Sequence, residues 1–428
     1  MAKKQKRNIL TKIDEIISDK VNKTKSKSGG KKTYNILRGK KIKGASIFLV
    51  VFIFLMSGVL FYMDIAPFNF EIDGNFFKYY TYQPNDPNLN LSNLQEQDFR
   101  FHMIDVWQGD CLLVELPDGK RMLIDGGKKS NDVASSIISY ILSETLGLKN
   151  QYGIVTIDYV LLTHADADHC GSLDDVIKSD KICVGEVFRP MILSNYNNDP
   201  LKEYADEFNY QVSTVSTTVY SDLVKAVENE QNCITHYNIG ESTISGNGYD
   251  MYFFNPTADM YKNISSAADK NNVSPIVLLC VNRRKILLTG DADKEQEDNF
   301  LAKLNNNGYG ISLDDADVDF LKVGHHGGKE STNKVFLDAV KPEYALISVG
   351  ESNSYGHPTV EVLNRLSEIG CSGKIYRTDK KGNIVLTIDS EGEFSFVFGN
   401  SDTVNAKIIK RALYNAFFNA TLKARKYL

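Results

Sequence analysis

Two histidines and two aspartates fall within the six residues from His164 to His169, in the segment LLTHADADHCGS. In an extended chain, residues two apart point the same way, so His164 and Asp166 can converge on one point. Asp168 and His169, at the turn into a helix, can address a second point. Imidazole and carboxylate groups together suit Zn²⁺, Mn²⁺ or Fe²⁺ better than Ca²⁺. The spacing therefore predicts one or two metal ions, bound side by side.

A simpler explanation is a polar loop that caps the helix beginning near His169, with Asp168 as the N-cap. Capping needs only one carboxylate, however, and a loop needs neither imidazole. Two other apolar runs also deliver ligand-type side chains: KILLTGDAD reaches Asp291, and FLKVGHHGG ends at His325 and His326. Because these groups arrive where buried strands meet loops, the sequence favours a metal site over a cap.

The elements that must position these groups alternate along the chain. Alternating apolar residues and turn residues predict strands, and helical spacing predicts helices at 131–147 and 294–304. The expected strands lie within 99–106, 111–116, 121–127, 157–162, 184–190, 251–256, 273–281, 285–291, 318–323, 344–350 and 374–378, with a closing hairpin at 383–398. The class is therefore α/β, with antiparallel meanders mixed among crossover units.

The N-terminal part of the chain is strongly basic. From Met1 to Lys43 there are 15 Lys or Arg against 3 acidic residues, a net +12, which leaves −17 for the remainder of a chain whose total is −5. Residues 44–63 carry no charge, and about 20 apolar residues span roughly 30 Å as a helix, the thickness of a bilayer core. We expect an uncleaved transmembrane helix, because no small-residue cleavage pattern follows it. The positive-inside rule then predicts a cytoplasmic tail and an extracytoplasmic body.

Five parts are expected: a basic cytoplasmic tail at 1–43, the transmembrane helix at 44–63, a spacer at 64–97, a folded domain at 98–400 that carries the expected metal site, and a basic amphipathic helix at 401–428. That last helix is expected to dock on the domain or lie on the membrane. The six cysteines have no short spacings, which favours buried free thiols and leaves a disulfide open.

The motifs DVWQGD, LIDGG, THADADHCGS, LLTGD, LKVGHHGG, SVGESNSYGHP and RTDKKGN, in this order, resemble the metallo-β-lactamase superfamily. More narrowly, they resemble the extracytoplasmic hydrolase domain of the ComEC family of competence DNA-uptake proteins, over roughly residues 98–400. The resemblance implies an αββα sandwich with one or two divalent metal ions, Zn²⁺ or Mn²⁺, at the edge where the two sheets meet.

The resemblance also implies roles for individual residues. By position, the metal ligands would be His164 and Asp166 for the first ion, Asp168 and His169 for the second, Asp291 as a bridge, and His325 completing the second ion. Asp125 would support a ligand, and His326 and His357 would lie beside the metal or against the substrate. Asp168 and His357 are expected to act in catalysis, with His357 positioning or protonating the leaving group.

The sequence departs from the superfamily pattern at the first metal position. Asp166 stands where a second imidazole is usual, and no histidine supplies the ligand normally found between the second motif and Asp291. The first site is therefore poorer in nitrogen, which makes Mn²⁺ a candidate beside Zn²⁺.

The expected reaction is hydrolysis. A bound metal ion lowers the pKa of its water, so that hydroxide becomes available as the nucleophile, and it stabilises charge that develops on an attacked phosphorus. We expect a membrane-anchored phosphodiesterase or nuclease acting on DNA outside the cell, with a separate membrane channel as a possible partner. Two alternatives stay open: a hydrolase of cell-wall or lipid phosphoesters of the teichoic-acid type, and a catalytically silent binding protein.

Overall fold

The computed structural model describes residues 98–399, apart from 145–152, 211, 238, 241, 258–259, 264–267 and 307. The expected cytoplasmic tail, transmembrane helix, spacer and C-terminal helix lie outside the described residues and stay predictions. In the part of the chain that is described, no helix is both long enough and apolar enough to span a bilayer.

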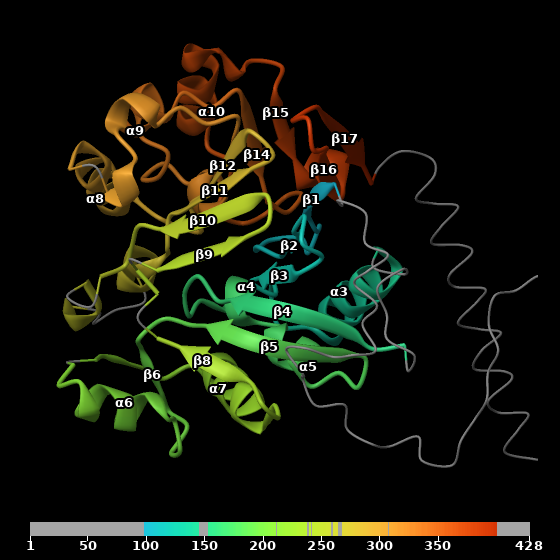
Figure 1. Ribbon diagram of the computed structural model, residues 1–428, viewed down its shortest axis with the longest axis vertical. Coiled ribbons are helices and arrows are strands. Elements are labelled where there is room, and N and C mark those ends of the chain that lie inside the picture. The colour runs from blue at the N-terminus through green and yellow to red at the C-terminus, as the bar shows by residue number, and fades with distance from the viewer. Residues whose placement is uncertain are drawn as a thin grey trace, which may run out of the picture. The chain divides into compact units, whose positions relative to one another are not determined.

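The first of the two large sheets has eight strands in the order β17-β16-β1-β2-β3-β4-β5-β8 (Figure 1). This sheet includes two strands, β16 and β17, from the C-terminal end of the described chain. Its strands are β1 (Phe99–Met103), β2 (Leu112–Glu115), β3 (Arg121–Ile124), β4 (Val155–Leu161), β5 (Ile182–Phe188), β8 (Ile234–His236), β16 (Ile384–Ile388) and β17 (Phe394–Phe398). From β3 to β8 the neighbours are parallel, so crossovers must connect them. The helices α3 (Asn131–Glu144), α4 (Ala167–Cys170), α5 (Leu173–Ile177) and α7 (Thr218–Asn229) lie in these crossovers.

The second sheet has seven strands in the order β15-β14-β13-β12-β11-β10-β9. Its strands are β9 (Thr243–Gly246), β10 (Tyr249–Phe253), β11 (Val277–Val281), β12 (Arg284–Leu288), β13 (Phe320–Lys322), β14 (Tyr344–Ile347) and β15 (Ile375–Arg377). The strands from β12 to β15 are parallel. Their crossovers contain α8 (Lys294–Asn305), α9 (Lys334–Val340) and α10 (Val360–Leu366), and α11 (Thr378–Lys381) follows β15.

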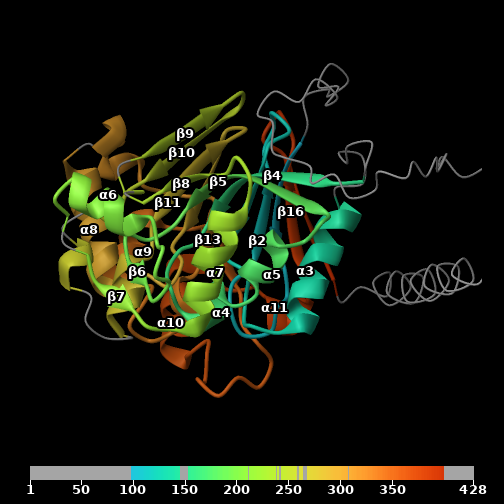
Figure 2. The same ribbon diagram turned by 90° about the horizontal axis from the view of Figure 1, so that it is seen from below.

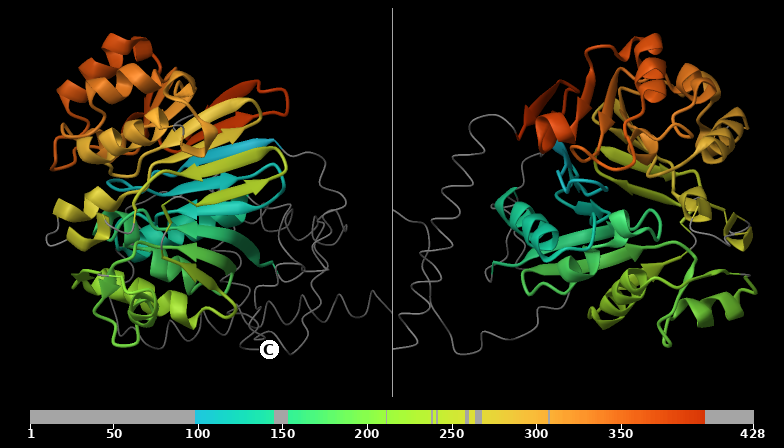
Figure 3. Two further views of the ribbon diagram at one scale, coloured as in Figure 1. Left: turned by 60° about the vertical axis from the view of Figure 1, so that its left-hand side comes forward. Right: turned by 180° about the vertical axis from the view of Figure 1, so that it is seen from behind.

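The two sheets pack face to face, because one face of each strand is apolar and needs a partner. Phe99, Phe101 and Met103 of β1 share a buried cluster with Ile286 and Leu288 of β12. Separate apolar clusters join the first sheet to α3, α5 and α7, and the second sheet to α8, α9 and α10. Figures 1 and 3 show these helices on the outer sides of the two sheets. The mixed α/β class and the two-sheet sandwich expected from the sequence are confirmed.

Within the described residues, the expected strands and helices occur near their expected positions. The sequence predicted no elements between β5 and β10. That stretch holds the two-stranded sheet of β6 (Leu193–Ser194) and β7 (Thr214–Val215), the helix α6 (Leu201–Glu207), and α7, β8 and β9. None of the six cysteines forms a disulfide. Four of them are buried, as the sequence favoured, whereas Cys233 and Cys280 are partly exposed.

The loops that carry the ligand-type residues gather at one edge of the sandwich. Figure 2 shows α4, α10 and α11 along this edge. Backbone and side-chain contacts tie the edge together: Asp110 N–H donates to the Asp168 carbonyl at 3.2 Å, and Ser348 Oγ donates to the Gly109 carbonyl at 2.7 Å. Residues far apart in the sequence thus meet where β1, β4 and β14 end.

Candidate metal centre

The loop after β4 brings two imidazoles into the interior. His164 and His169 are completely buried, and their ring centroids lie 4.1 Å apart. Asp166, rather than Asp168, is the N-cap of α4, and its side chain makes no capping hydrogen bond. Helix capping therefore does not account for the acidic residues of this loop.

The second sheet supplies the carboxylate on which these rings converge. Asp291 follows β12 after Gly290, whose φ of +50° reverses the chain. Its Oδ2 lies 3.2 Å from Nε2 of His169 and 4.0 Å from Nε2 of His164. Nε2 of His326, from the loop after β13, is 3.6 Å from the same oxygen. Side chains from both sheets thus surround one point.

The donor atoms at this point fit a divalent cation. His164, His169 and Asp291 form one group able to hold an ion, and Asp168, His169 and His326 form another. Nε2 of each of these three histidines is buried without a hydrogen-bond partner, as is Oδ1 of Asp291. Buried polar atoms are normally satisfied, and unpaired imidazole nitrogens facing carboxylates are the ligand set that Zn²⁺ and Mn²⁺ bind.

Hydrogen bonds on the far side of two rings aim these nitrogens inward. Nδ1 of His169 donates to Asp125 Oδ2 at 2.7 Å, and Asp125 in turn accepts from Thr163 N–H at 2.8 Å and Thr163 Oγ at 2.7 Å. Nδ1 of His326 donates to the Ser348 carbonyl at 2.9 Å. Each bond fixes the tautomer that leaves Nε2 free as a ligand.

The charge balance of the cluster also favours a cation. Burial alone would lower the pKa of His169, but the Asp291 and Asp125 carboxylates outweigh it and raise that pKa. Burial likewise opposes a charge on His326, yet Asp291 and Asp110 raise its pKa to about 9. Carboxylates that hold protons on neighbouring imidazoles can hold a metal ion in their place, because metal binding displaces such protons.

The structure favours His326 over His325 as a metal ligand, whereas the resemblance implied His325. His326 is buried and belongs to two of the groups that could hold a metal, one of which it shares with Asp168 at 3.6 Å. His325, expected as the ligand, has a side chain 33% exposed, and its Nε2 is 3.8 Å from Asp291 Oδ2. Both residues have left-handed φ angles, 47° and 53°, so the turn sends their side chains in different directions. His326 is therefore the better-placed ligand.

Asp166 and His357 lie at the margin of the cluster. Oδ2 of Asp166 is 3.8 Å from Nε2 of His164, and its side chain is 29% exposed, so it faces the expected first metal position from the open side. The ring of His357 packs edge-on against His325, with centroids 5.4 Å apart. Burial and the nearby His325 and His326 rings lower the pKa of His357 to about 4, so this imidazole is neutral at pH 7.

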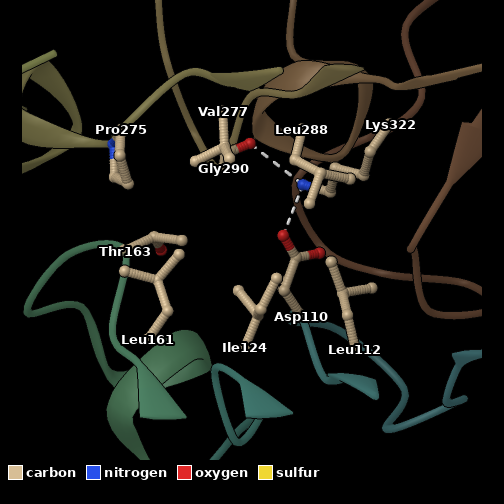
Figure 4. Close-up of a pocket in the computed structure, with 10 residues that line it drawn as sticks. All are labelled: Asp110, Leu112, Ile124, Leu161, Thr163, Pro275, Val277, Leu288, Gly290 and Lys322. Carbon is tan, nitrogen blue, oxygen red and sulfur yellow. Dashed lines mark hydrogen bonds and ion pairs between the residues drawn. The ribbon is translucent and has the colours of Figure 1, made fainter. Parts of the chain in front are cut away.

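Beneath the cluster lies an ion pair that the sequence analysis did not assign. Lys322, at the end of β13, contacts Asp110 and donates to the Gly290 carbonyl at 2.9 Å (Figure 4). Both side chains are about 1% exposed, and apolar side chains such as Leu112 and Val277 line the same pocket. Two features of the sequence could have indicated this pair. Asp110 stands in the DVWQGD motif, and Lys322 is a lone charge within the apolar run FLKV.

Comparison with known proteins agrees with this arrangement. Residues 104–187, which run from the end of β1 into β5 and include His164 to His169, match the family model described as "Metallo-beta-lactamase superfamily". This segment of the chain is therefore similar to the metallo-β-lactamase superfamily.

Three curated relatives narrow the resemblance to competence and recombination proteins. The chain is 29% identical over 292 residues to "ComE operon protein 3" of Bacillus subtilis (strain 168), which covers 66% of this chain and 32% of the relative. It is 28% identical over 243 residues to "Competence protein ComA" of Neisseria gonorrhoeae, which covers 57% of this chain and 27% of the relative. It is 26% identical over 281 residues to "Recombination protein 2" of Haemophilus influenzae, which covers 65% of this chain and 28% of the relative. The matched part thus spans less than a third of each relative's length.

Solved structures resemble the chain more distantly. The metallo-β-lactamase fold protein YhfI from Bacillus subtilis is 11% identical, with 70% of this chain and 100% of that chain covered and a TM-score of 0.38. Zn²⁺-bound PqqB from Methylobacterium extorquens is 10% identical, with 63% and 85% covered and a TM-score of 0.35. At these scores, neither likeness adds to the assignment of the site.

Proposed function

We propose that this chain is a metal-dependent phosphodiesterase that cleaves DNA outside the cytoplasm. The observation that carries the proposal is the convergence of unpaired Nε2 atoms of His164, His169 and His326 on Asp291. A divalent cation bound there would supply Lewis-acid stabilisation of a phosphoryl oxygen and an activated water. The resemblance to competence proteins supports DNA as the substrate.

Other residues of the chain orient the imidazole ligands and accept hydrogen bonds at the rim of the site. Asp125, Thr163 and Ser348 hold the imidazoles in their ligand tautomers. The side chain of Asp168 is 26% exposed, and its contacts with the His326 and His169 rings outweigh burial and lower the pKa of this carboxyl. It therefore stays ionised and accepts hydrogen bonds from water or substrate at the rim.

His357 is placed to orient a substrate oxygen at the open side of the cluster. Its Nδ1 is buried without a partner, and the low pKa keeps the ring neutral at pH 7. A neutral imidazole is a weak proton donor, so we assign His357 to positioning through a hydrogen bond rather than to protonation of the leaving group. We expect His357→Ala to lower turnover while the metal content stays near normal.

The proposed location follows from the sequence alone. The basic tail and uncharged span predict a single-pass membrane anchor with its N-terminus in the cytoplasm. A reporter that is active only outside the cytoplasm, fused after Leu428, should give a signal. An inactive fusion, beside an active cytoplasmic reporter at the same position, would contradict this orientation.

The reaction is tested with the full-length chain purified in detergent, stripped by chelator and reloaded with one metal at a time. The substrates are labelled single-stranded DNA, double-stranded DNA, RNA and isolated cell wall. We expect DNA cleavage that Mn²⁺ restores better than Mg²⁺, because Mg²⁺ seldom takes imidazole ligands. Asp291→Asn should abolish cleavage, whereas Asp298→Asn on the exposed face of α8, whose side chain is 47% exposed, should not.

Two outcomes would overturn the proposal. Release of phosphorylated substituents from cell wall without cleavage of any nucleic acid would assign the site to cell-wall phosphoesters. A metal-loaded protein that hydrolyses none of these substrates would favour the silent binding protein.

A further inference from the structure

The single tryptophan of the chain stands exposed at the rim of the metal centre. Trp107 is 74% exposed, and its backbone has a left-handed φ of 68°. A bulky residue in this region costs about 1–2 kcal/mol relative to an ordinary conformation, and such strain persists mainly where surrounding structure fixes it, often at ligand sites. Both the exposure of the large indole ring to water and the left-handed backbone of Trp107 are therefore unfavourable in free energy.

The backbone around Trp107 is held firmly against the centre. Its own N–H donates to Asp105 Oδ1 at 3.0 Å, and the neighbouring Gln108 accepts from Gly350 N–H at 3.2 Å. Two residues on, a Cβ added to Gly109 would lie 2.2 Å from the carbonyl oxygen of Asp168. The backbone at Trp107 is thus anchored beside the loop that carries the metal ligands.

A second exposed aromatic side chain lies on the loop between β14 and α10. Tyr355 is 65% exposed, and its ring centroid is 5.8 Å from that of His357, which in turn packs on His325. Nε2 of His325 is 3.8 Å from Asp291 Oδ2. Successive ring contacts therefore lead from the surface at Tyr355 to the metal ligand.

Exposed lysines accompany both aromatic residues. Lys128 follows Gly127, whose N–H donates to the Asp110 carbonyl at 2.8 Å and whose added Cβ would meet Val106, the neighbour of Trp107, at 2.8 Å. The side chain of Lys329 is 70% exposed, and it follows Gly328, where an added Cβ would lie 3.3 Å from the His357 ring. Each exposed ring thus has a lysine on an adjacent loop, and Nζ of Lys329 lies 3.4 Å from Oε1 of Glu330 at the surface.

We propose that Trp107 and Tyr355 stack on unpaired nucleobases of the substrate, while Lys128 and Lys329 contact its phosphates, so that the centre acts on single-stranded DNA. This inference rests on the proposed phosphodiesterase function and names the form of its substrate. Flat rings beside cations are the means by which proteins hold single strands without sequence preference. Bases inside a duplex have no free face to offer.

The surroundings of the two rings argue against a protein or lipid partner. Gln108 on one loop and Ser352, Asn353 and Ser354 on the other are polar, and the apolar neighbour Val106 is buried. Docking of a protein or a lipid surface calls for a contiguous apolar patch, whereas base stacking needs only isolated rings at suitable spacing.

The single tryptophan provides a direct test that does not depend on catalysis. The full-length chain, kept from cleaving by chelator, is titrated with a 12-nucleotide oligothymidylate, with an abasic strand of the same length, and with a 12-base-pair duplex. We expect strong quenching of tryptophan emission by the oligothymidylate only. Equal quenching by the abasic strand, or binding of the oligothymidylate without a change in emission, would overturn the proposal.

Variants test the same point by affinity for a labelled oligothymidylate. Trp107→Ala and Tyr355→Ala should each raise Kd about 5- to 150-fold, the equivalent of about 1–3 kcal/mol of stacking per base. Phe208→Ala, which removes an exposed ring 52% accessible on another element, should leave Kd unchanged. Trp107→Gly relieves the left-handed strain, so weakened binding in that variant, with an unchanged or higher thermal midpoint, cannot be due to misfolding.

Hydrolysis of a small phosphodiester, bis(p-nitrophenyl) phosphate, separates this inference from the proposed function. The Trp107 and Tyr355 variants should lose far less activity on this substrate than on the oligothymidylate, because it offers no series of bases for the two rings to stack on. If the wild type hydrolyses it and both variants bind the oligothymidylate like the wild type, the stacking proposal alone is wrong. If the wild type hydrolyses no phosphodiester, the proposed function is wrong, and the quenching experiment still decides the stacking.

Discussion

The ammonium group of Lys322 and the carboxylate of Asp110 form an ion pair in the interior, where each side chain is about 1% exposed. Oδ1 of Asp110 also lies 3.4 Å from Nδ1 of His326, and Lys322 donates to the carbonyl that precedes Asp291. The pair therefore links the loop after β1 to both ligand-bearing loops of the second sheet. Removal of one partner from such a buried pair leaves an uncompensated charge.

Lys322→Met should lower the free energy of unfolding by about 3–5 kcal/mol, because Asp110 is then buried without its partner. The double variant Lys322→Met/Asp110→Leu should recover most of the loss, since no buried charge remains. Urea denaturation followed by far-ultraviolet circular dichroism measures both. Lys294→Met, which removes a surface pair with Asp298, is the control and should change little. A double variant as unstable as the single one would contradict this account.

The same pair predicts a dependence of stability on acid. Burial raises the pKa of Asp110, but Lys322 and the His326 ring outweigh it and lower that pKa to about 2 from the ordinary 3.8. Ionised Asp110 therefore stabilises the fold fully above about pH 4, and this contribution is lost as the pH falls through about 2. The wild type should lose more stability between pH 5 and pH 2 than Lys322→Met/Asp110→Leu. Parallel curves for the two proteins would rule this out.

Gly109→Ala should weaken metal binding at least tenfold. The added Cβ would lie 2.2 Å from the Asp168 carbonyl oxygen, so the loop after β1 must move away from the start of α4. Gly310→Ala is the matched control: its φ is +74° and nothing lies within 4 Å of an added Cβ, so it should show backbone strain alone, about 1 kcal/mol. Metal titration of both variants distinguishes the two effects, and equal affinities would count against the close contact.

Asp125→Ala should reduce metal affinity about 10- to 100-fold, because His169 loses the acceptor that fixes its tautomer. Asp125 is fully buried and accepts hydrogen bonds from the His169 ring and from the Thr163 hydroxyl. Asp118→Ala, which removes contacts with Lys120 and Tyr249, should leave the affinity unchanged. Unaltered binding by Asp125→Ala would show that His169 needs no such support.

The sequence predicted the strands around the site well, because each has a buried face and a turn at its end. The ligand loop after β4 was equally readable, since His164, Asp166, Asp168 and His169 are close in the sequence and their spacing alone suggests convergence. The strands from β6 to β9 were not predicted, because they are two to four residues long and offer too few positions for a period to emerge. The helix α7, with 12 residues, was long enough to be predicted and was missed.

Contacts between distant segments were beyond the sequence. The pair of Asp110 and Lys322 exists only because β1 and β13 end at the same edge of the sandwich. The choice between His325 and His326 depends on two consecutive left-handed residues, a backbone conformation that non-glycine residues seldom adopt. Neighbouring positions with the same chemistry could not be ranked without that geometry.

The most direct test of the account is the metal content of the full-length protein after loading with Mn²⁺ and dialysis, measured by plasma mass spectrometry. The wild type should retain one or two ions per chain, His325→Ala should retain nearly as much, and His326→Ala and Asp291→Asn should each lose most of it. A protein that retains no Mn²⁺ or Zn²⁺, or an Asp291→Asn variant that keeps the full complement, would contradict a metal centre at this cluster.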